Sequence, residues 1–213
     1  MSAAEDQTFA ALLTEIRVCT LCAPYLPLGP RPVVRGLPSA RLLVISQAPG
    51  SRVHETGRSF DDRSGDRLRS WLGIDRDAFY DESRVAVMPM GFCYPGRAAK
   101  GGDRPPRPEC APLWHPRLRP HFAAIGLTLL IGGYAIRHYL PQTRREPLGA
   151  VMPRWRGFLP DFFVLPHPSW RAALWERKNP WFAAEMLPAL RARVGAAQPS
   201  ASIRSMSSSL KPR

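Results

Sequence analysis

Four short apolar runs constrain the fold of this chain more than any other feature. The runs cover residues 41–46, 84–88, 127–131 and 162–165. Runs this short and this apolar are typical of parallel strands that are buried on both faces. Helical patterns lie between them, and strands that alternate with helices form a sheet covered on both sides. The sequence therefore predicts an α/β fold, with three α/β/α layers around a central, mostly parallel four-stranded sheet.

Helices are expected where apolar residues recur at helical spacing and capping residues mark the ends. The expected helices are Thr8–Val18, Gly65–Trp71 with Ser64 as its cap, Gly133–Leu140 and Pro180–Val194. A long loop with several prolines and basic residues is expected from Met90 to about Pro116. Ser and Ala dominate after residue 194, so we expect one domain over 1–194 and a disordered basic tail over 195–213.

Hydrophobicity and the first residues argue against a membrane or secreted protein. No stretch approaches the roughly 18 consecutive apolar residues of a membrane span. The first ten residues carry Glu5 and Asp6 but no basic residue, so they do not resemble a secretory signal. We therefore expect a cytoplasmic protein with no membrane partner, and we expect it to be a monomer.

The chain is strongly basic, with 30 Lys and Arg residues against 17 Asp and Glu residues and a net charge of +13. The segment 195–213 contributes only Arg204, Lys211 and Arg213 to this excess, so most of it lies in the body of the chain. A field of this sign attracts polyanions and speeds their capture. The charge is also compatible with a role in solubility alone, but it favours a nucleic acid as partner.

Three notable loops follow predicted strands. They are Gln47–Gly50, Pro89–Tyr94 and Pro166–Arg171. In open parallel sheets the functional site lies beyond the carboxyl ends of the strands. The fold alone therefore predicts that these three loops meet.

The four cysteines of the chain are Cys19, Cys22, Cys93 and Cys110. The first two form a C-x2-C pair, a spacing that lets two thiolates bind one metal centre from a turn. Disulfides are disfavoured in a cytosolic protein of this size. A zinc site and an iron–sulfur cluster both take four thiolates, and the spacing does not decide between them. Four unrelated core cysteines are the remaining alternative.

Several short motifs occur together in this chain. The first strand leads into Gln47-Ala-Pro-Gly50, then Glu55-Thr-Gly-Arg-Ser-Phe60 and the pair Ser64-Gly65, and the fourth strand leads into His167-Pro-Ser169. With the cysteine layout and the segment Asn179–Phe182, this combination resembles the uracil-DNA glycosylase superfamily over residues 17–194. It is most similar to the iron–sulfur branch of that superfamily.

The resemblance implies a DNA-repair enzyme that flips uracil from DNA and hydrolyses its N-glycosidic bond, leaving an abasic site. Its partner is then DNA containing uracil. The resemblance also implies a [4Fe–4S] cluster held by the four cysteines.

Four positions depart from the family pattern. Gln47 replaces the acid of the iron–sulfur branch, and Ala48 replaces the Asp of the best-known branch. Pro89 occupies the position of the Asn that reads the edge of uracil, and Trp170 follows the H-P-S motif. Neither the usual acid nor the usual base-reading amide is therefore where the family has it.

Cleavage of the N-glycosidic bond builds positive charge on the sugar and sends electrons into the departing base. It therefore needs a carboxylate or a polarised water near the sugar and a donor to the base carbonyl. His167, which matches the H-P-S histidine, is the expected donor. The expected carboxylate is Asp62, then Asp61, with Glu55 as a third candidate. Alternation along an extended loop would place Asp62 on the same side as Phe60 and Asp61 on the other. Both aspartates could instead only favour the start of the next helix.

The remaining candidates contact the base or the DNA backbone. Phe60 is the expected stacking platform for the flipped base. The Gln47 amide and the backbone N–H groups of Gln47, Ala48 and Met90 are candidates to bind the base in place of the missing Asn. The expected DNA-binding residues are Ser64, Gly65, Ser169, Trp170 as a wedge, Arg171, Arg104 and Arg107.

Two other functions stay open. A glycosylase for another deaminated base such as hypoxanthine is favoured by Pro89, because the base-reading Asn is absent. A protein that binds damaged DNA without catalysis is favoured by the loss of the acids at Gln47 and Ala48.

Overall fold

The computed structural model describes residues 3–99 and 101–198 of the 213-residue chain. Its centre is a sheet of four strands in the order β2-β1-β3-β4, and every neighbouring pair is parallel. The strands are β1 (Leu42–Ile45), β2 (Val85–Val87), β3 (Leu127–Ile131) and β4 (Phe162–Leu165). The predicted four-stranded α/β architecture is confirmed.

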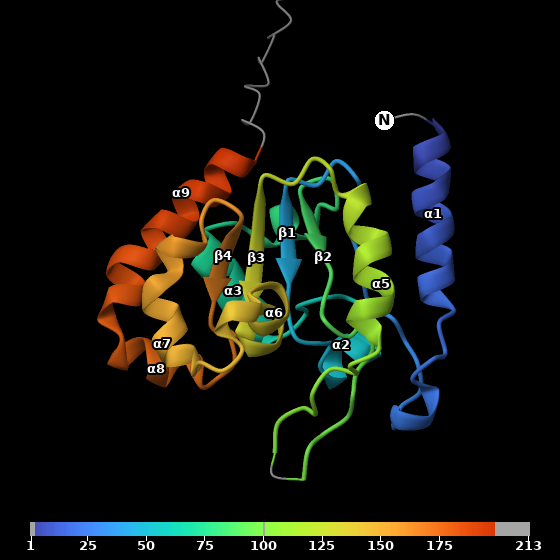
Figure 1. The fold of residues 1–213 in the computed structure, drawn as a ribbon, viewed down its shortest axis with the longest axis horizontal. Coiled ribbons are helices and arrows are strands. Elements are labelled where there is room, and N and C mark those ends of the chain that lie inside the picture. The colour runs from blue at the N-terminus through green and yellow to red at the C-terminus, as the bar shows by residue number, and fades with distance from the viewer. Residues whose placement is uncertain (1–2, 100, 199–213) are drawn as a thin grey trace, which may run out of the picture.

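The strand register aligns the four strand ends. Val44 pairs with Val87 on one side and with Leu129 on the other, and Leu129 pairs with Phe163. Apart from the half-buried Phe162, every strand residue is buried, as expected for a sheet covered on both faces. Because the strands are parallel, their carboxyl ends meet at one edge, which is the lower edge in Figure 1.

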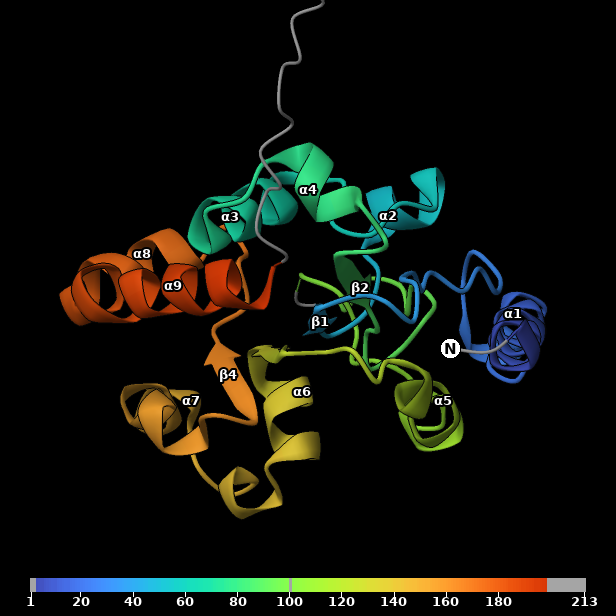
Figure 2. The same ribbon diagram turned by 90° about the horizontal axis from the view of Figure 1, so that it is seen from above.

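Helices cover both faces of the sheet (Figure 2). One face carries α3 (Arg63–Leu72), α4 (Arg76–Tyr80), α8 (Ala172–Lys178) and α9 (Leu187–Ala197). The other carries α1 (Ala3–Arg17), α5 (Cys110–Leu118), α6 (Gly132–Tyr139) and α7 (Leu148–Val151). Helix α9 packs on β3 and α3, α6 packs on β3 and β4, and α1 packs on α5. This is the three-layer α/β/α arrangement predicted above.

Short elements complete the described chain. Helix α2 (Ser51–Thr56) follows β1 near the carboxyl edge of the sheet. The 3-10 turns are η1 (Ala23–Tyr25), η2 (Arg119–His121), η3 (Pro141–Thr143) and η4 (Met152–Phe158), and the π-helical turn η5 (Phe182–Met186) precedes α9. No helix among the described residues is long and apolar enough to span a membrane.

Several predicted boundaries are wrong. Asp62, not Ser64, caps α3, because its side chain accepts a hydrogen bond from the Gly65 N–H at 2.9 Å. The expected loop to Pro116 ends earlier, because α5 begins at Cys110 and contains that proline. Helix α9 continues to Ala197, and Arg84 Nε donates to Gln198 Oε1 at 2.7 Å, so 195–197 are helical rather than tail. The rest of the expected tail, 199–213, lies outside the described residues.

The turn between α2 and α3 is unusually tight. Phe60 has a φ of +57°, a left-handed conformation that side chains rarely adopt. A Cβ on Gly65 would lie 1.7 Å from the Phe60 carbonyl oxygen, so only glycine fits there. The same oxygen accepts a hydrogen bond from Arg69 Nη1 at 3.2 Å. The turn therefore depends on close backbone contact with Gly65.

Gly65→Ala should lower the free energy of unfolding by about 3 kcal/mol, because the new methyl group would displace backbone rather than a flexible side chain. Chemical denaturation measures this change. The control is Gly195→Ala in α9, where a Cβ meets nothing within 4 Å, and it should stabilise the protein by up to about 1 kcal/mol. Equal effects of the two variants would contradict the assigned role of Gly65.

Candidate active site

A cavity of about 710 Å³ opens at the carboxyl edge of the sheet. The loops after β1, β2 and β4 all contribute to its walls, as predicted from the fold. A hairpin formed by residues 96–99 and 101–104 extends below this edge in Figure 1 and contributes a further wall. The polar and charged residues that line the cavity are Ser46, Gln47, Ser59, Asp62, Ser64, Arg97, Asp103, His167, Ser169 and Arg171.

His167 lies directly beyond β4, in the wall of the cavity. A Cβ on Gly132, whose φ is +79°, would lie 3.4 Å from the His167 Cβ, so α6 begins close against the histidine backbone. Burial lowers the pKa of His167, while the negative charge of Asp62 acts in the opposite direction. The imidazole is therefore neutral near neutral pH and can still donate one N–H.

The three candidate carboxylates are separated by the structure. Asp62 lines the cavity together with Phe60. Asp61 lies outside it and pairs with Arg76 at 2.6 Å, a contact that lowers the pKa of the Asp61 carboxyl. Glu55 is exposed on α2 and does not line the cavity either. The structure therefore brings only Asp62 of the three to His167.

The expected base contacts are partly brought together. Gln47, Ala48 and Phe60 line the cavity, and the Phe60 ring packs edge-on against Phe79 with 5.9 Å between ring centroids. Met90 differs from expectation: it is buried outside the cavity, and its N–H donates to the Ser46 carbonyl at 2.8 Å. This N–H is therefore engaged in the loop and is not free for a base.

The rim contains most of the expected DNA contacts. Ser64, Ser169, Trp170 and Arg171 line the cavity mouth. The Trp170 side chain is 79% exposed and is stacked by Arg171 at 5.0 Å, so a large aromatic surface faces solvent. Gly65 is buried and donates its N–H to Asp62, so it does not reach the rim.

Arg104 and Arg107 lie away from the cavity. Both line a proline-rich groove near Tyr25. Arg107 pairs with Glu109 at 2.6 Å and lies over the Tyr25 ring at 4.0 Å. Arg104 contributes its carbonyl oxygen, which accepts a hydrogen bond from Gln47 Nε2 at 3.3 Å. Their expected contact with DNA is therefore outside the cavity.

Pro89 occupies the position of the family's Asn, and its backbone carbonyl contacts the buried His115. His115 Nε2 lies 3.0 Å from the Pro89 carbonyl oxygen, and Nδ1 lies 2.7 Å from the Tyr139 hydroxyl. A carbonyl can only accept, so Nε2 carries the proton and Tyr139 donates to Nδ1. Burial lowers the pKa of His115 to about 4, which keeps it neutral. Sequence reasoning missed this pair, because neither residue belongs to a strand-end loop.

Asp103 was also missed. It lines the cavity from the hairpin, and burial of its carboxylate and the charge of Asp62 raise its pKa, while Arg97 acts in the opposite direction. Its only signal in the sequence is that it is the sole acid between Glu82 and Glu109.

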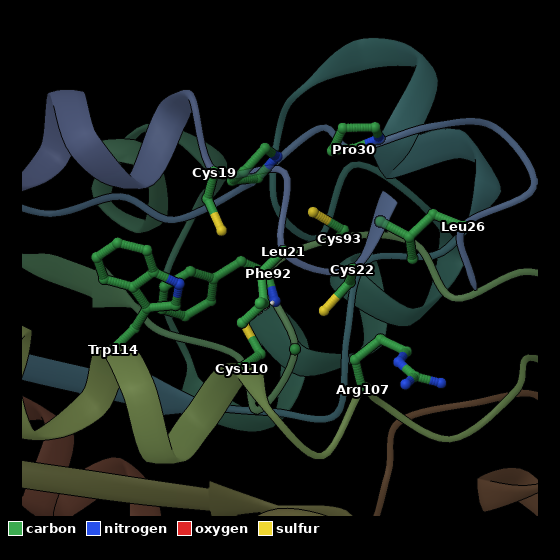
Figure 3. Close-up of a pocket in the computed structure, with 12 residues that line it drawn as sticks. Cys19, Leu21, Cys22, Leu26, Pro30, Phe92, Cys93, Arg107, Cys110 and Trp114 are labelled. Atoms are coloured by element: carbon green, nitrogen blue, oxygen red, sulfur yellow. Dashed lines mark hydrogen bonds between the residues drawn. The ribbon is translucent and has the colours of Figure 1, made fainter. Parts of the chain in front are cut away.

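The four cysteines surround a separate, mostly apolar hollow (Figure 3). Their sulfur atoms point toward a common space from the C-x2-C turn, the loop after β2 and the start of α5. The Phe92 N–H donates to Cys110 Sγ at 3.3 Å. Burial raises the pKa of Cys93 to about 11 and that of Cys110 to about 12. Among residues 3–99 and 101–198, no group of three or more His, Cys, Asp or Glu side chains is arranged to hold a metal ion.

The two functions open to Asp62, helix capping and charge, can be separated by substitution. Asn is as good an N-cap as Asp, whereas Ala lacks the accepting oxygen. Asp62→Asn should therefore unfold at nearly the same denaturant concentration as the wild type, and Asp62→Ala should lose about 1 kcal/mol. Denaturant unfolding followed by circular dichroism measures the stability of both variants. If Asp62→Asn lost as much unfolding free energy as Asp62→Ala, the negative charge itself would stabilise the fold.

Comparison with known families agrees with this geometry. The model of the uracil DNA glycosylase superfamily matches residues 34–191, which include every strand and all the loops that form the cavity. Proteins of this superfamily act on DNA as glycosylases. The match covers most of the chain, and the chain belongs to the uracil-DNA glycosylase superfamily.

Proposed function

We propose that this protein is a monofunctional uracil-DNA glycosylase that flips uracil from DNA into the cavity and hydrolyses its N-glycosidic bond, leaving an abasic site. The observation that carries the proposal is the arrangement of three side chains around one cavity. Asp62 and Phe60 reach it from the turn before α3, and His167 reaches it from the end of β4. A carboxylate, an aromatic face and a neutral donor are the groups that this reaction needs.

Each side chain has a distinct task in the proposed reaction. Phe60 stacks on the flipped base. The Asp62 carboxylate stabilises the positive charge that develops on the sugar as the bond to the base breaks. His167, neutral because burial lowers its pKa, donates its N–H to the base carbonyl that gains negative charge. A neutral donor suits this step because it leaves the negative charge of Asp62 uncompensated.

The rim supplies the proposed contacts with DNA. Ser64, Ser169 and Arg171 bind phosphates that flank the lesion, and the exposed ring of Trp170 enters the space left by the flipped base. The net charge of +13 supports attraction to the DNA backbone. We propose that the enzyme acts as a monomer.

Hypoxanthine is a second candidate substrate. Pro89 stands where the family has its uracil-reading Asn, and its carbonyl oxygen already accepts from His115. The cavity wall therefore lacks the side-chain amide that selects uracil, which favours a site with broader base tolerance.

We also propose that the four cysteines hold a [4Fe–4S] cluster. Four thiols around one apolar hollow fit the donor set of such a cluster, and the Phe92 N–H to Cys110 is the kind of hydrogen bond that stabilises a cluster thiolate. Bound there, the cluster would cross-link the segment before β1 to the loop after β2 and to α5.

Asp62→Asn and His167→Ala should each lower the single-turnover rate of uracil excision by at least about 100-fold, because each removes one electrostatic contact with the transition state. Affinity for DNA should change little. The measurement is release of uracil from a labelled duplex with enzyme in excess.

Asp61→Asn is the matched control, because it changes the neighbouring carboxylate that faces Arg76. It should keep near-normal excision. If Asp61→Asn or Glu55→Gln abolished excision while Asp62→Asn did not, the assignment of Asp62 would be wrong.

The purified protein should be brown, with broad absorbance near about 400 nm and about four iron atoms per chain. Cys110→Ala should lose both, because it removes one of the four ligands. Optical spectra together with metal analysis test this. Zinc without iron would overturn the cluster assignment.

A further inference from the structure

Besides Asp62, a second carboxylate lines the cavity, that of Asp103. We propose that Asp103, carried by the hairpin between Gly96 and Arg104, activates the water that attacks the sugar. This inference rests on the proposed glycosylase function and assigns the base for its hydrolytic step. The supporting observations are the position of Asp103, its lack of a partner, and the way the hairpin is held.

The position of Asp103 is defined by the turn after β1. Its Oδ2 lies 3.6 Å from the point where a Cβ on Gly50 would be. Gly50 closes the Gln47-Ala-Pro-Gly50 turn, so the carboxylate lies against the loop in which both acids of the family pattern are replaced, at Gln47 and Ala48. Asp103 therefore returns a negative charge to this part of the cavity from a different segment of the chain.

The carboxylate has no neutralising contact. Within residues 3–99 and 101–198, the Asp103 side chain makes no hydrogen bond and no ion pair, although Arg97 lies near enough to lower its pKa. Neighbouring atoms nevertheless desolvate it partly, and the charge of Asp62 opposes its ionisation. Asp103 is exposed by solvent accessibility, so its raised pKa supports the proposal only together with its place in the cavity, where acids with a shifted pKa are candidates for proton transfer.

The backbone of the hairpin holds Asp103 in place. Arg97 and Asp103 form an antiparallel bridge, and the Arg104 N–H donates to the Gly96 carbonyl at 2.8 Å. Gln47 Nε2 donates to the Arg104 carbonyl at 3.3 Å, which ties the hairpin directly to the turn after β1. The Gln47 side chain therefore helps to hold the hairpin strand that carries Asp103.

The C1′–N bond breaks and its electron pair passes to the base, whose carbonyl oxygen is stabilised by His167. A water molecule forms the new C1′–O bond and gives one proton to the Asp103 carboxylate, which later returns it to solvent. Asp62 keeps its charge throughout. The two carboxylates therefore have two tasks, and the raised pKa of Asp103 suits the one that accepts a proton.

The test is single-turnover excision by Asp103→Asn over a range of pH. Only ionised Asp103 accepts a proton, so the wild-type rate should fall as pH drops through its pKa, which lies above the ordinary value for aspartate. The charged or titratable groups that face it are Asp62, Arg97, His167 and Arg171 in the cavity and Tyr94 beside the hairpin. Asp103→Asn should be slower by about 100-fold or more near neutral pH and should lose this acid limb.

Two further variants separate the proposal from simpler effects. Asp161→Asn removes an exposed carboxylate outside the cavity and should leave both rate and pH profile unchanged. Asp103→Glu keeps the charge and should recover part of the rate and the acid limb. If the wild type excises uracil and Asp62→Asn is slow, but Asp103→Asn keeps the normal rate and pH profile, the role of Asp103 is refuted while the glycosylase function stands. If the wild type releases no base, the function itself fails.

Discussion

The four parallel strands are buried on both faces, so the polar side chains that line the cavity lie beyond the ends of the strands. Apolar β1 and β3 are flanked by strands on both sides and covered by helices on both faces, so no charged group can be accommodated among them. Polar side chains follow β1 at Ser46 and Gln47 and follow β4 at His167. The parallel register then places the loops after β1, β2 and β4 around one cavity.

The turn that precedes α3 both starts this helix and contributes side chains to the cavity. Phe60 adopts a left-handed conformation, its carbonyl contacts Gly65, and Asp62 caps the helix while it lines the cavity. Asp61 pairs with Arg76 outside the cavity. The conformation of this turn places only one of two adjacent carboxylates in the cavity with His167. Helix capping and a place in the cavity are therefore compatible in Asp62, since the cap uses only Oδ1.

Much of this arrangement could be predicted from the sequence, because strands and their terminal loops are local features. The apolar runs located all four strands, and the loop motifs located His167, Phe60 and Asp62. The alternation argument assumed an extended segment, whereas Phe60 is left-handed in a tight turn, so the separation of Asp62 from Asp61 comes from the turn and not from alternation. What could not be predicted depends on contacts between distant segments. Asp103 lines the cavity from a hairpin that folds back onto Gln47, whose side chain donates to Arg104, 57 residues later in the chain.

The remaining differences have equally specific causes. Met90 is tied to Ser46 by its N–H, so it belongs to the loop and not to the cavity. Helix α5 was not predicted because it contains Pro112 and Pro116, and prolines are typical of loops rather than of helix interiors. The short α2, α4, α7 and α8 lack the length at which apolar periodicity becomes readable.

The measurement that tests the central claim most directly is the time course of abasic-site formation by the wild-type protein on three duplexes that differ at one base. One carries uracil, one hypoxanthine and one the normal base. Our account predicts that uracil is released and an abasic site is left, with no release from the normal duplex. Tight binding to the uracil duplex without any base release would contradict it and would show a DNA-binding protein without glycosylase activity.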